Sequence, residues 1–277
     1  MSRSLTSAGL ALERDRVELA CLGARGRVEL LEAQPLAARL FCGSPTAQAQ
    51  AHLAEALRSL AGGLARRFVP LHVSVPDAAV RYATFELDQI PKTRAARLEL
   101  LRFRFARQGM EPEAVCAEQA LGRDAGKPLL FGMAMEAAWQ RLVTLALAQA
   151  GLRAWSLSAN VCRQFNRFHE RLTQASGALV ALAPDAWSLW LWDERGRPRY
   201  ARARWRLGGE DRAEIAQEVE RSILAYVHGA SGRAIEGVFV AADAEAGGLG
   251  EALDARLRAP CVRLEAQAGA VAAAFER

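Results

Sequence analysis

A repeated order of elements constrains the fold of this chain more than any other feature. Three short apolar segments within residues 8–34 alternate as strands do. A helical segment with the N-cap residue Ser44 follows, and then a buried strand at 71–76. From Gly177 onward the same order of three strands, a helix and a strand returns. A repeat of this kind predicts two structurally equivalent lobes within one chain.

The residues between the two copies form a unit of their own. An extended run at 78–87 leads into a basic amphipathic helix at about 92–108, and a strand is predicted at 129–135. We therefore expect a small α+β subdomain inserted into the first lobe. The predicted boundaries are 1–77 with 152–176 for the first lobe, 78–151 for the inserted subdomain and 177–277 for the second lobe.

Several stretches, taken in their order and spacing, resemble one known family. They are GLALERDRVELACLGARGRVELLEAQPL, LHVSVPDAAVRYATFEL, AARLELLRFRFARQ, QAGLRAW and EIAQEVERSILAYVHGASGRAIEGVFVA. They resemble the opening strands, the entry to the insertion, the inserted helix, the exit strand and a helix–strand pair of PilM. This is the actin-like protein of type IV pilus assembly. The resemblance implies an α/β fold of the actin-like (ribonuclease-H-like) type, with two duplicated lobes of mixed sheet and helices and the small inserted subdomain.

The same resemblance implies a non-catalytic scaffold. Such a protein would be cytoplasmic and peripheral to the inner membrane, in the assembly platform of a type IV pilus or a related secretion or DNA-uptake machine. It would bind the cytoplasmic tail of a PilN-like single-span membrane protein, with the motor ATPase as a further partner. Residues of the inserted subdomain would border the partner's groove, and the candidates are Phe85, Leu87, Ile90 and Phe103.

The positions that would hold a nucleotide depart from the family pattern. A member that binds ATP has two D-x-G turns, a lysine after the first turn, and two glycines in the adenosine loop. The matching positions here are Ala11, Glu13, Glu18, Ala181, Ala183, Ala241 and Ala242. Carboxylates hold hydrated Mg²⁺, and glycine lets backbone N–H groups approach phosphate. We therefore expect neither ATPase activity nor a cofactor, while nucleotide binding without hydrolysis stays open. The alternative is an ATPase or kinase relative with unorthodox phosphate loops.

The chain is basic, with a formal net charge of +5 and a pI near 9.2. A third hypothesis, a basic nucleic-acid-binding module, rests on the stripe formed by Arg202, Arg204 and Arg206. Their alternation with apolar residues favours a solvated strand face instead. The inserted helix forms a second basic surface, whose candidate contacts are Arg94, Arg97, Arg102 and Arg104. Acidic lipid headgroups and an acidic protein are both possible partners for it.

No other motif indicates a catalytic or metal site. The five cysteines and four histidines are dispersed, and no CxxC pair, GxSxG or HExxH motif occurs. No apolar run approaches the roughly 18 residues of a membrane span. The sequence therefore predicts no catalytic residues and no metal.

Overall fold

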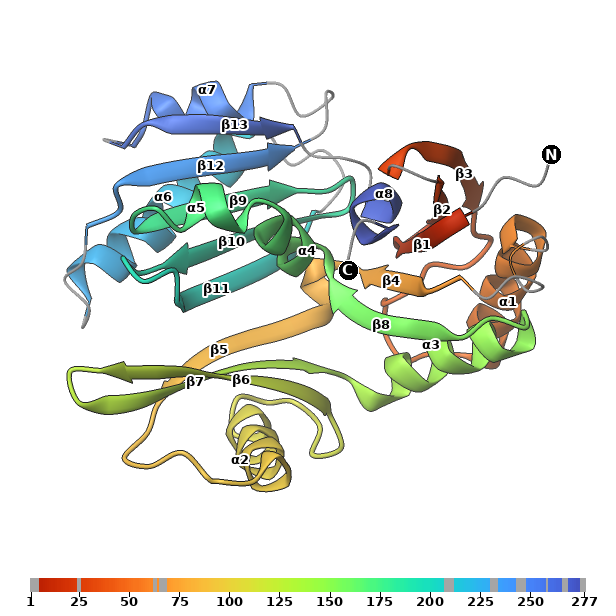
Figure 1. Cartoon of the computed structure of the whole chain (residues 1–277), viewed down its shortest axis with the longest axis horizontal. Helices are drawn as coiled ribbons and strands as arrows, with labels where there is room; N and C mark the ends of the chain where they lie inside the picture. The colour runs from red at the N-terminus through yellow and green to blue at the C-terminus, as the bar shows by residue number, and fades with distance from the viewer. Residues whose placement is uncertain are drawn as a thin grey trace. The chain divides into compact units, whose positions relative to one another are not determined.

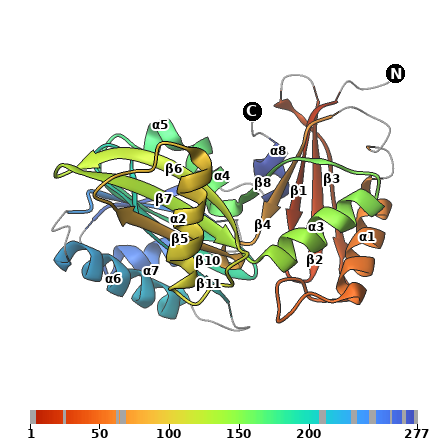
Figure 2. The ribbon, with the colours of Figure 1, turned by 90° about the horizontal axis from the view of Figure 1, so that it is seen from below.

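The computed structural model describes most of the chain. The described residues are 5–23, 26–61, 64, 69–206, 212–229, 234–242, 248–257, 259–265 and 269–274. The chain forms two compact units (Figures 1 and 2). Unit 1 comprises Met1–Ala79, Ala137–Arg167 and Ala266–Arg277, and unit 2 comprises Val80–Glu136 and Phe168–Glu265.

Unit 1 is built on a five-stranded mixed sheet in the order β3-β2-β1-β4-β8. Its strands are β1 (Leu5–Leu12), β2 (Arg16–Gly23), β3 (Val28–Pro35), β4 (Leu71–Val75) and β8 (Ala154–Ala159). The first three strands form an antiparallel meander, and β4 and β8 join it in parallel. Strands β2 and β4 are almost entirely buried, and β1 is buried from Ala8 to Leu12, because helices cover both faces of the sheet centre.

Two groups of helices cover this sheet. They are α1 (Ala47–Ala61) with α3 (Ala137–Gln149), and α4 (Asn160–Arg167) with α8 (Gly269–Ala274). Helix α8 comes from the far end of the chain. Its Val271 and Ala274 pack on Ala11, Ala20 and Leu22 of the first hairpin. The end of the sequence therefore completes the core of the first unit.

Unit 2 contains a second five-stranded sheet in the order β11-β10-β9-β12-β13. Its strands are β9 (Gly177–Leu182), β10 (Ala186–Trp192), β11 (Pro198–Trp205), β12 (Gly237–Ala242) and β13 (Cys261–Glu265). Strand directions repeat those of the first sheet: an antiparallel meander followed by two parallel strands. The duplication predicted from the sequence is therefore confirmed.

The helices of the second unit supply the apolar core of that sheet. Helix α6 (Arg212–His228) buries Ile215, Ala216 and Val219, and α7 (Leu249–Asp254) buries Leu249 and Leu253. The short helix α5 (His169–Leu172) precedes β9. This arrangement follows from the predicted 3.6-residue period of apolar positions.

The insertion forms a three-stranded antiparallel sheet in the order β5-β7-β6. Its elements are β5 (Val80–Glu86), which follows the 3-10 turn η2 (Asp77–Ala79), then α2 (Arg94–Ala106), β6 (Val115–Asp124) and β7 (Lys127–Met135). Thr93 caps α2 by accepting the Ala96 N–H at 3.2 Å. Leu101 and Phe105 of α2 are fully buried, and a Cβ at Gly132 of β7 would lie 2.6 Å from Leu101. Glycine is therefore needed for the helix to pack this closely.

Three local features differ from the sequence expectation. Strand β6 was not predicted, because most of its residues are polar or exposed and show no apolar period. The helix predicted at 160–174 divides at Phe168 into α4 and α5. Helix α8 was also missed, since it is a short alanine-rich segment that is defined only by its packing on the first hairpin.

Candidate functional site

The turn between β1 and β2 holds an ion cluster where a nucleotide-binding relative would hold phosphate. The Glu13 N–H donates to the carbonyl of Arg16 at 2.9 Å and closes the hairpin. The Arg16 guanidinium lies 2.5 Å from Glu13 Oε2 and 3.0 Å from Glu18 Oε1, and both carboxylates are nearly buried. The hydrogen bond to Glu13 raises the pKa of Arg16, although its partial burial opposes the shift. Ala11, across the hairpin from Glu18, is buried.

The turn between β9 and β10 is closed in the same way. The Ala183 N–H donates to Ala186 O at 2.8 Å, and the Arg206 N–H donates to Asp185 O at 2.8 Å. The Arg206 side chain donates to the carbonyls of Ala183 (3.2 Å) and Pro184 (3.1 Å). In both equivalent turns, backbone N–H and C=O groups form the hydrogen bonds that close the hairpin. An arginine side chain lies against each turn.

The remaining predicted nucleotide positions are alanines at strand ends. Ala181 and Ala241 are buried in β9 and β12. Ala242 ends β12, and its side chain lies outside the described residues, as do positions 243–247 of the predicted adenosine loop. The described positions therefore offer methyl groups in a packed sheet and no phosphate ligand.

Three of the four predicted groove residues lie in or against the core of the inserted sheet. Leu87 belongs to the buried cluster that includes Leu101 and Phe105, and Phe85 and Ile90 pack against that cluster. The Phe85 and Phe105 rings meet edge to face at 5.8 Å. Phe103 differs, because 59% of its surface is exposed on α2.

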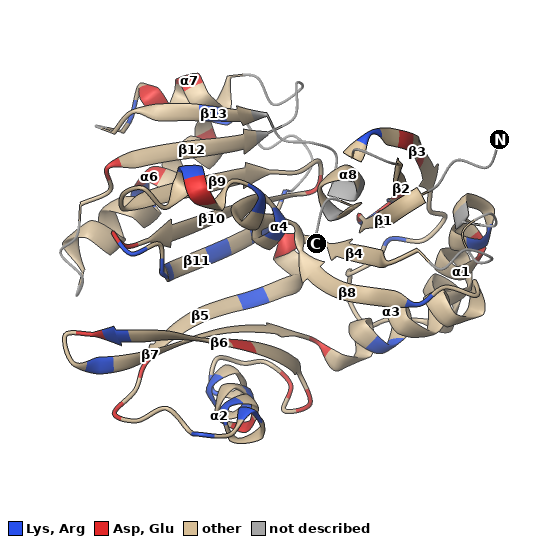
Figure 3. Cartoon of the chain, in the orientation of Figure 1, with Lys and Arg blue, Asp and Glu red and all other residues tan. Residues whose placement is uncertain are grey.

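The predicted basic surface divides into structural and exposed arginines. Arg97 forms an ion pair with Glu118 of β6 at 2.9 Å, and the Arg104 guanidinium lies over the Phe85 ring at 5.9 Å. Arg94 and Arg102 are exposed. Figure 3 shows the basic residues gathered along α2.

The arginine stripe of β11 is engaged within its own unit. Arg202 and Arg204 both contact Glu218 of α6, at 3.1 and 3.3 Å, and Arg202 also donates to Ser222 Oγ. Arg206 contacts the β9–β10 turn, as described above. These contacts give the stripe a structural role that requires no nucleic acid.

The most exposed large apolar side chain among the described residues was missed from the sequence. Trp155 of β8 is 78% exposed, and Leu157 on the same strand is 37% exposed. The register between β4 and β8 shifts between Leu71 and His72, so that Trp155 is an extra residue without a partner on β4. A bulge of this kind turns a side chain away from regular packing, which explains how a tryptophan reaches solvent.

Strand β8 is also an unprotected sheet edge. Within its own sheet it pairs with β4 alone. Its sequence, AWSLSA, contains no charged residue and no proline. The other edge strands of the three sheets all carry charged residues, and β3 ends in Pro35 as well. Charges and prolines protect edges from pairing with other chains, so their absence distinguishes β8. The absence of charged residues from AWSLSA was the sequence feature that could have identified this edge.

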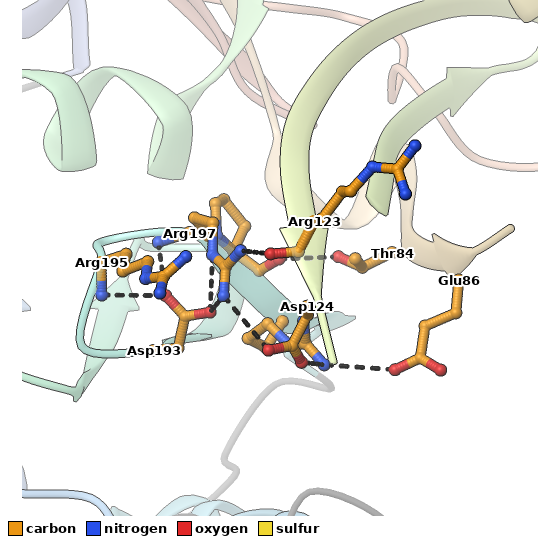
Figure 4. Close-up of polar contacts among 9 residues, drawn as sticks. Thr84, Glu86, Arg123, Asp124, Asp193, Arg195 and Arg197 are labelled. Atoms are coloured by element: carbon orange, nitrogen blue, oxygen red, sulfur yellow. Dashed lines mark hydrogen bonds and ion pairs between the residues drawn. The ribbon is translucent and has the colours of Figure 1, made fainter. Parts of the chain in front are cut away.

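A buried ion network connects the inserted sheet to the edge of the second sheet (Figure 4). Asp193 is fully buried at the end of β10, and its carboxylate accepts hydrogen bonds from the Arg195 and Arg197 N–H groups and the Arg197 guanidinium, at 2.8–3.2 Å. Arg197 also donates to the Arg123 carbonyl at 2.6 Å and contacts Asp124 at 3.4 Å. The network thus joins the β10–β11 turn to the β6–β7 turn.

Further contacts extend this junction along β5 and β11. Arg199 lies 3.0 Å from Asp124 and 3.3 Å from Glu86, and Thr84 Oγ1 donates to the Pro198 carbonyl at 2.8 Å. Trp190 of β10 packs edge to face against Tyr82 and Phe131 of the inserted sheet.

The pKa of Asp193 follows from its position in this network. Burial disfavours the charged carboxylate, but the Arg197 side chain and the two backbone N–H groups outweigh that effect. The net result is a pKa below the ordinary aspartate value. Asp193 is therefore a structural anion and not a proton donor or acceptor near neutral pH.

The described residues contain neither a metal-binding cluster nor a membrane-spanning helix. No group of three or more His, Cys, Asp or Glu side chains there is placed to hold a metal ion. None of the described helices has the length and apolar character needed to cross a membrane.

Comparisons with known proteins give a fold and no sequence family. No protein-family model matches the chain. No curated protein sequence matches it either.

The chain is similar to solved structures at low sequence identity. One is from a PilM–PilN type IV pilus biogenesis complex, with a TM-score of 0.75 and 17% identity over 94% of this chain and 88% of that one. Another is a Bacteroides thetaiotaomicron protein with an actin-like ATPase fold, with a TM-score of 0.56 and 10% identity over 95% and 91%.

A third similar structure is the cytoplasmic domain of EpsL, an inner-membrane component of the type II secretion system of Vibrio cholerae. It has a TM-score of 0.53 and 13% identity over 87% of this chain and 82% of that one. Together with the duplicated sheets, these likenesses confirm the predicted fold: the chain has an actin-like α/β fold with a small inserted sheet.

Proposed function

We propose that this protein is a non-catalytic, actin-like scaffold of a pilus or related secretion platform, and that it binds an extended segment of a PilN-like membrane protein. The observation that carries this proposal is the β8 edge, with its uncharged sequence and the exposed Trp155. The structural likeness to PilM in its complex with PilN supports the class of partner.

The edge of β8 suits an extended peptide. An edge strand presents backbone N–H and C=O groups that an added strand can pair with, and alternate side chains of the added strand then meet the face of the sheet. The bulge lies near the start of β8 and leaves Ser156–Ala159 in regular register with β4. Trp155 and Leu157 provide apolar contacts for the side chains of the bound segment.

The closed turns support a function without catalysis. A phosphate site needs unoccupied N–H donors and positive charge. At the first turn the Glu13 N–H is committed to the hairpin, and two carboxylates lie beside Arg16. Asp193 is buried, and its carboxylate is committed to the Arg195 and Arg197 N–H groups and the Arg197 guanidinium.

The proposal is tested with the cytoplasmic N-terminal peptides of PilN-like proteins. Binding is measured by fluorescence anisotropy of a labelled peptide and by the intrinsic emission of the protein. We expect saturable binding with a blue shift, because burial of Trp155 removes water from an exposed indole. The blue shift should disappear in Trp155→Phe, since Phe keeps most of the contact but does not emit at the same wavelength.

Matched charge variants locate the contact. Leu157→Lys places a charge on the β8 edge and should abolish peptide binding. Leu224→Lys places the same charge on α6, at a side chain that is 46% exposed, and should bind normally. Equal loss in both variants, or no binding by the unmodified protein, would contradict the proposal.

A thermal-shift titration with Mg-ATP and Mg-ADP tests whether the chain binds nucleotide, which the nucleotide-binding alternative requires. A ligand that binds only the native state stabilises it by about 2.7 kcal/mol at a hundredfold excess over Kd. We expect an unchanged melting temperature up to millimolar nucleotide. A saturable rise would assign the chain to the nucleotide-binding alternative.

A further inference from the structure

The outer face of α2 carries a combination of side chains that the packing of this helix does not use. Leu101 and Phe105 bury the inner face, and Arg97 and Arg104 contact Glu118 and Phe85. The cations that remain exposed on the helix and beside its ends are Lys92, Arg94, Arg102 and Arg107. None of them forms an ion pair with an acid in the part of the chain that the structure describes.

An exposed aromatic ring lies among these cations. Phe103 is two residues from Phe105, so it points away from the sheet, and 59% of its surface is exposed. The Arg107 guanidinium lies 6.0 Å from the centre of the Phe103 ring. Glu99, one turn before Phe103, is the single acid of α2.

We propose that the exposed surface of α2, with Phe103, Arg102 and Arg107 on its outer face and Lys92 and Arg94 at its N-terminal end, contacts an anionic lipid surface. Guanidinium and ammonium groups attract lipid headgroups, and a phenylalanine among them enters the boundary between headgroups and acyl chains. Helix α2 packs its inner face on the inserted sheet, so the exposed Phe103 ring lies on the side of the helix away from that sheet. Among the exposed residues of α2 and its immediate flanks, from Lys92 to Arg107, four are cations and one, Glu99, is an acid, which supplies the charge complementarity.

The contact is weak by itself. Each basic residue near an anionic bilayer contributes about a fivefold change in partitioning, and one phenylalanine adds a modest apolar term. A protein held at the membrane by a second contact needs no more, since tethering raises the effective concentration of lipid. The proposed lipid contact involves only α2 and its flanking residues, and not the β8 edge.

Sedimentation of the purified chain with lipid vesicles tests the proposal. Vesicles of phosphatidylcholine with 30 mol% phosphatidylglycerol are compared with vesicles of phosphatidylcholine alone, at low and high salt. We expect binding only to the anionic vesicles and a steep loss at high salt. Arg102→Glu with Arg107→Glu should lower binding by at least roughly tenfold, and Phe103→Ser by a few fold.

Matched variants separate this site from general charge. Arg39→Glu with Arg58→Glu makes the same change in net charge at two exposed arginines of unit 1, and should reduce binding much less. Trp155→Ala should bind vesicles normally. A thermal melt of each variant verifies folding.

Three outcomes would overturn the proposal. They are no binding of the unmodified protein to anionic vesicles, an equal loss in the control pair, and binding to a polyglutamate peptide through α2 without binding to vesicles. The last outcome would assign the helix to an acidic protein partner.

Discussion

The two five-stranded sheets have the same strand order, yet two of their edge strands, β11 (which corresponds to β3) and β8 (which corresponds to β13), are used differently. The β5 strand lies alongside β11, where the Thr84–Pro198 hydrogen bond and the Arg199 ion pairs with Glu86 and Asp124 hold the inserted sheet. Among the described strands, β8 pairs within its sheet with β4 alone, and it exposes Trp155. Duplication therefore produced two sheets with the same strand order. The second sheet packs its β11 edge against the inserted sheet, whereas the β8 edge of the first sheet carries no charged residue.

The difference shows how one topology can serve both stability and recognition. At β11 the polar groups are buried and satisfied by partners within the chain, so the junction is specific and rigid. At β8 one side of the strand lacks a partner strand within its sheet. Its backbone N–H and C=O groups and its exposed apolar side chains can therefore bind another chain. We therefore expect substitutions at the first edge to change stability and substitutions at the second to change binding.

The largest effect is expected at the buried end of the ion network. Asp193→Ala leaves the Arg197 guanidinium without its main partner and should lower the free energy of unfolding by about 3 kcal/mol. Chemical denaturation of the full chain measures this change. Arg204→Ala removes an ion pair whose arginine is 49% exposed and should cost under about 1 kcal/mol. Similar losses in the two variants would contradict the role given to burial.

At the β8 edge we expect a binding effect without a stability effect. Trp155→Ala should lower the affinity for a platform peptide by about thirtyfold, the size typical of an aromatic hot spot. Its melting temperature should stay within a degree or two of the unmodified protein, because the side chain is 78% exposed. A large drop in melting temperature would mean that Trp155 is a core residue.

The ion network also predicts an acid dependence that the β8 edge lacks. The pKa of Asp193 is lower in the folded state, so the folded state favours the ionised carboxylate. Its stabilisation is present above the unfolded pKa of about 3.9 and is lost as pH falls through the folded pKa. Unfolding curves should therefore be nearly flat between about pH 5 and 6 and show, below about pH 4, a slope of up to about 1.4 kcal/mol per pH unit that is absent from Asp193→Asn. An identical slope in the variant would assign the dependence to other carboxylates.

The smallest expected effect concerns self-association. Leu157→Lys should change the free energy of unfolding by under about 0.5 kcal/mol, since Leu157 is already partly exposed. It should also suppress association between copies of the chain at high concentration, because a charged edge resists strand pairing. Light scattering measures this association, with Leu224→Lys as the control. Equal association of the two variants would mean that the β8 edge does not mediate contact between copies of the chain.

Local patterns predicted the architecture well, whereas the partner-groove residues stay a prediction. Each lobe's strands and helices follow from alternation, the 3.6-residue period and helix caps, which depend on near neighbours in sequence. The groove candidates Phe85, Leu87 and Ile90 are apolar residues beside an amphipathic helix, and apolar residues there pack on the helix. Whether an apolar side chain is core or surface depends on which strand lies beside it, and the pattern of a single segment does not contain that information.

The sequence by itself determined the duplicated order of strands and helices and the residue types at the predicted nucleotide positions, because each is a matter of residue type and order along the chain. Only the tertiary structure decided that Arg16 lies between Glu13 and Glu18, that Asp193 and Arg197 join two distant turns, and that Trp155 is exposed. Those features depend on contacts between remote segments, on strand register and on burial. These follow from the packing of the whole chain and not from any one stretch of it.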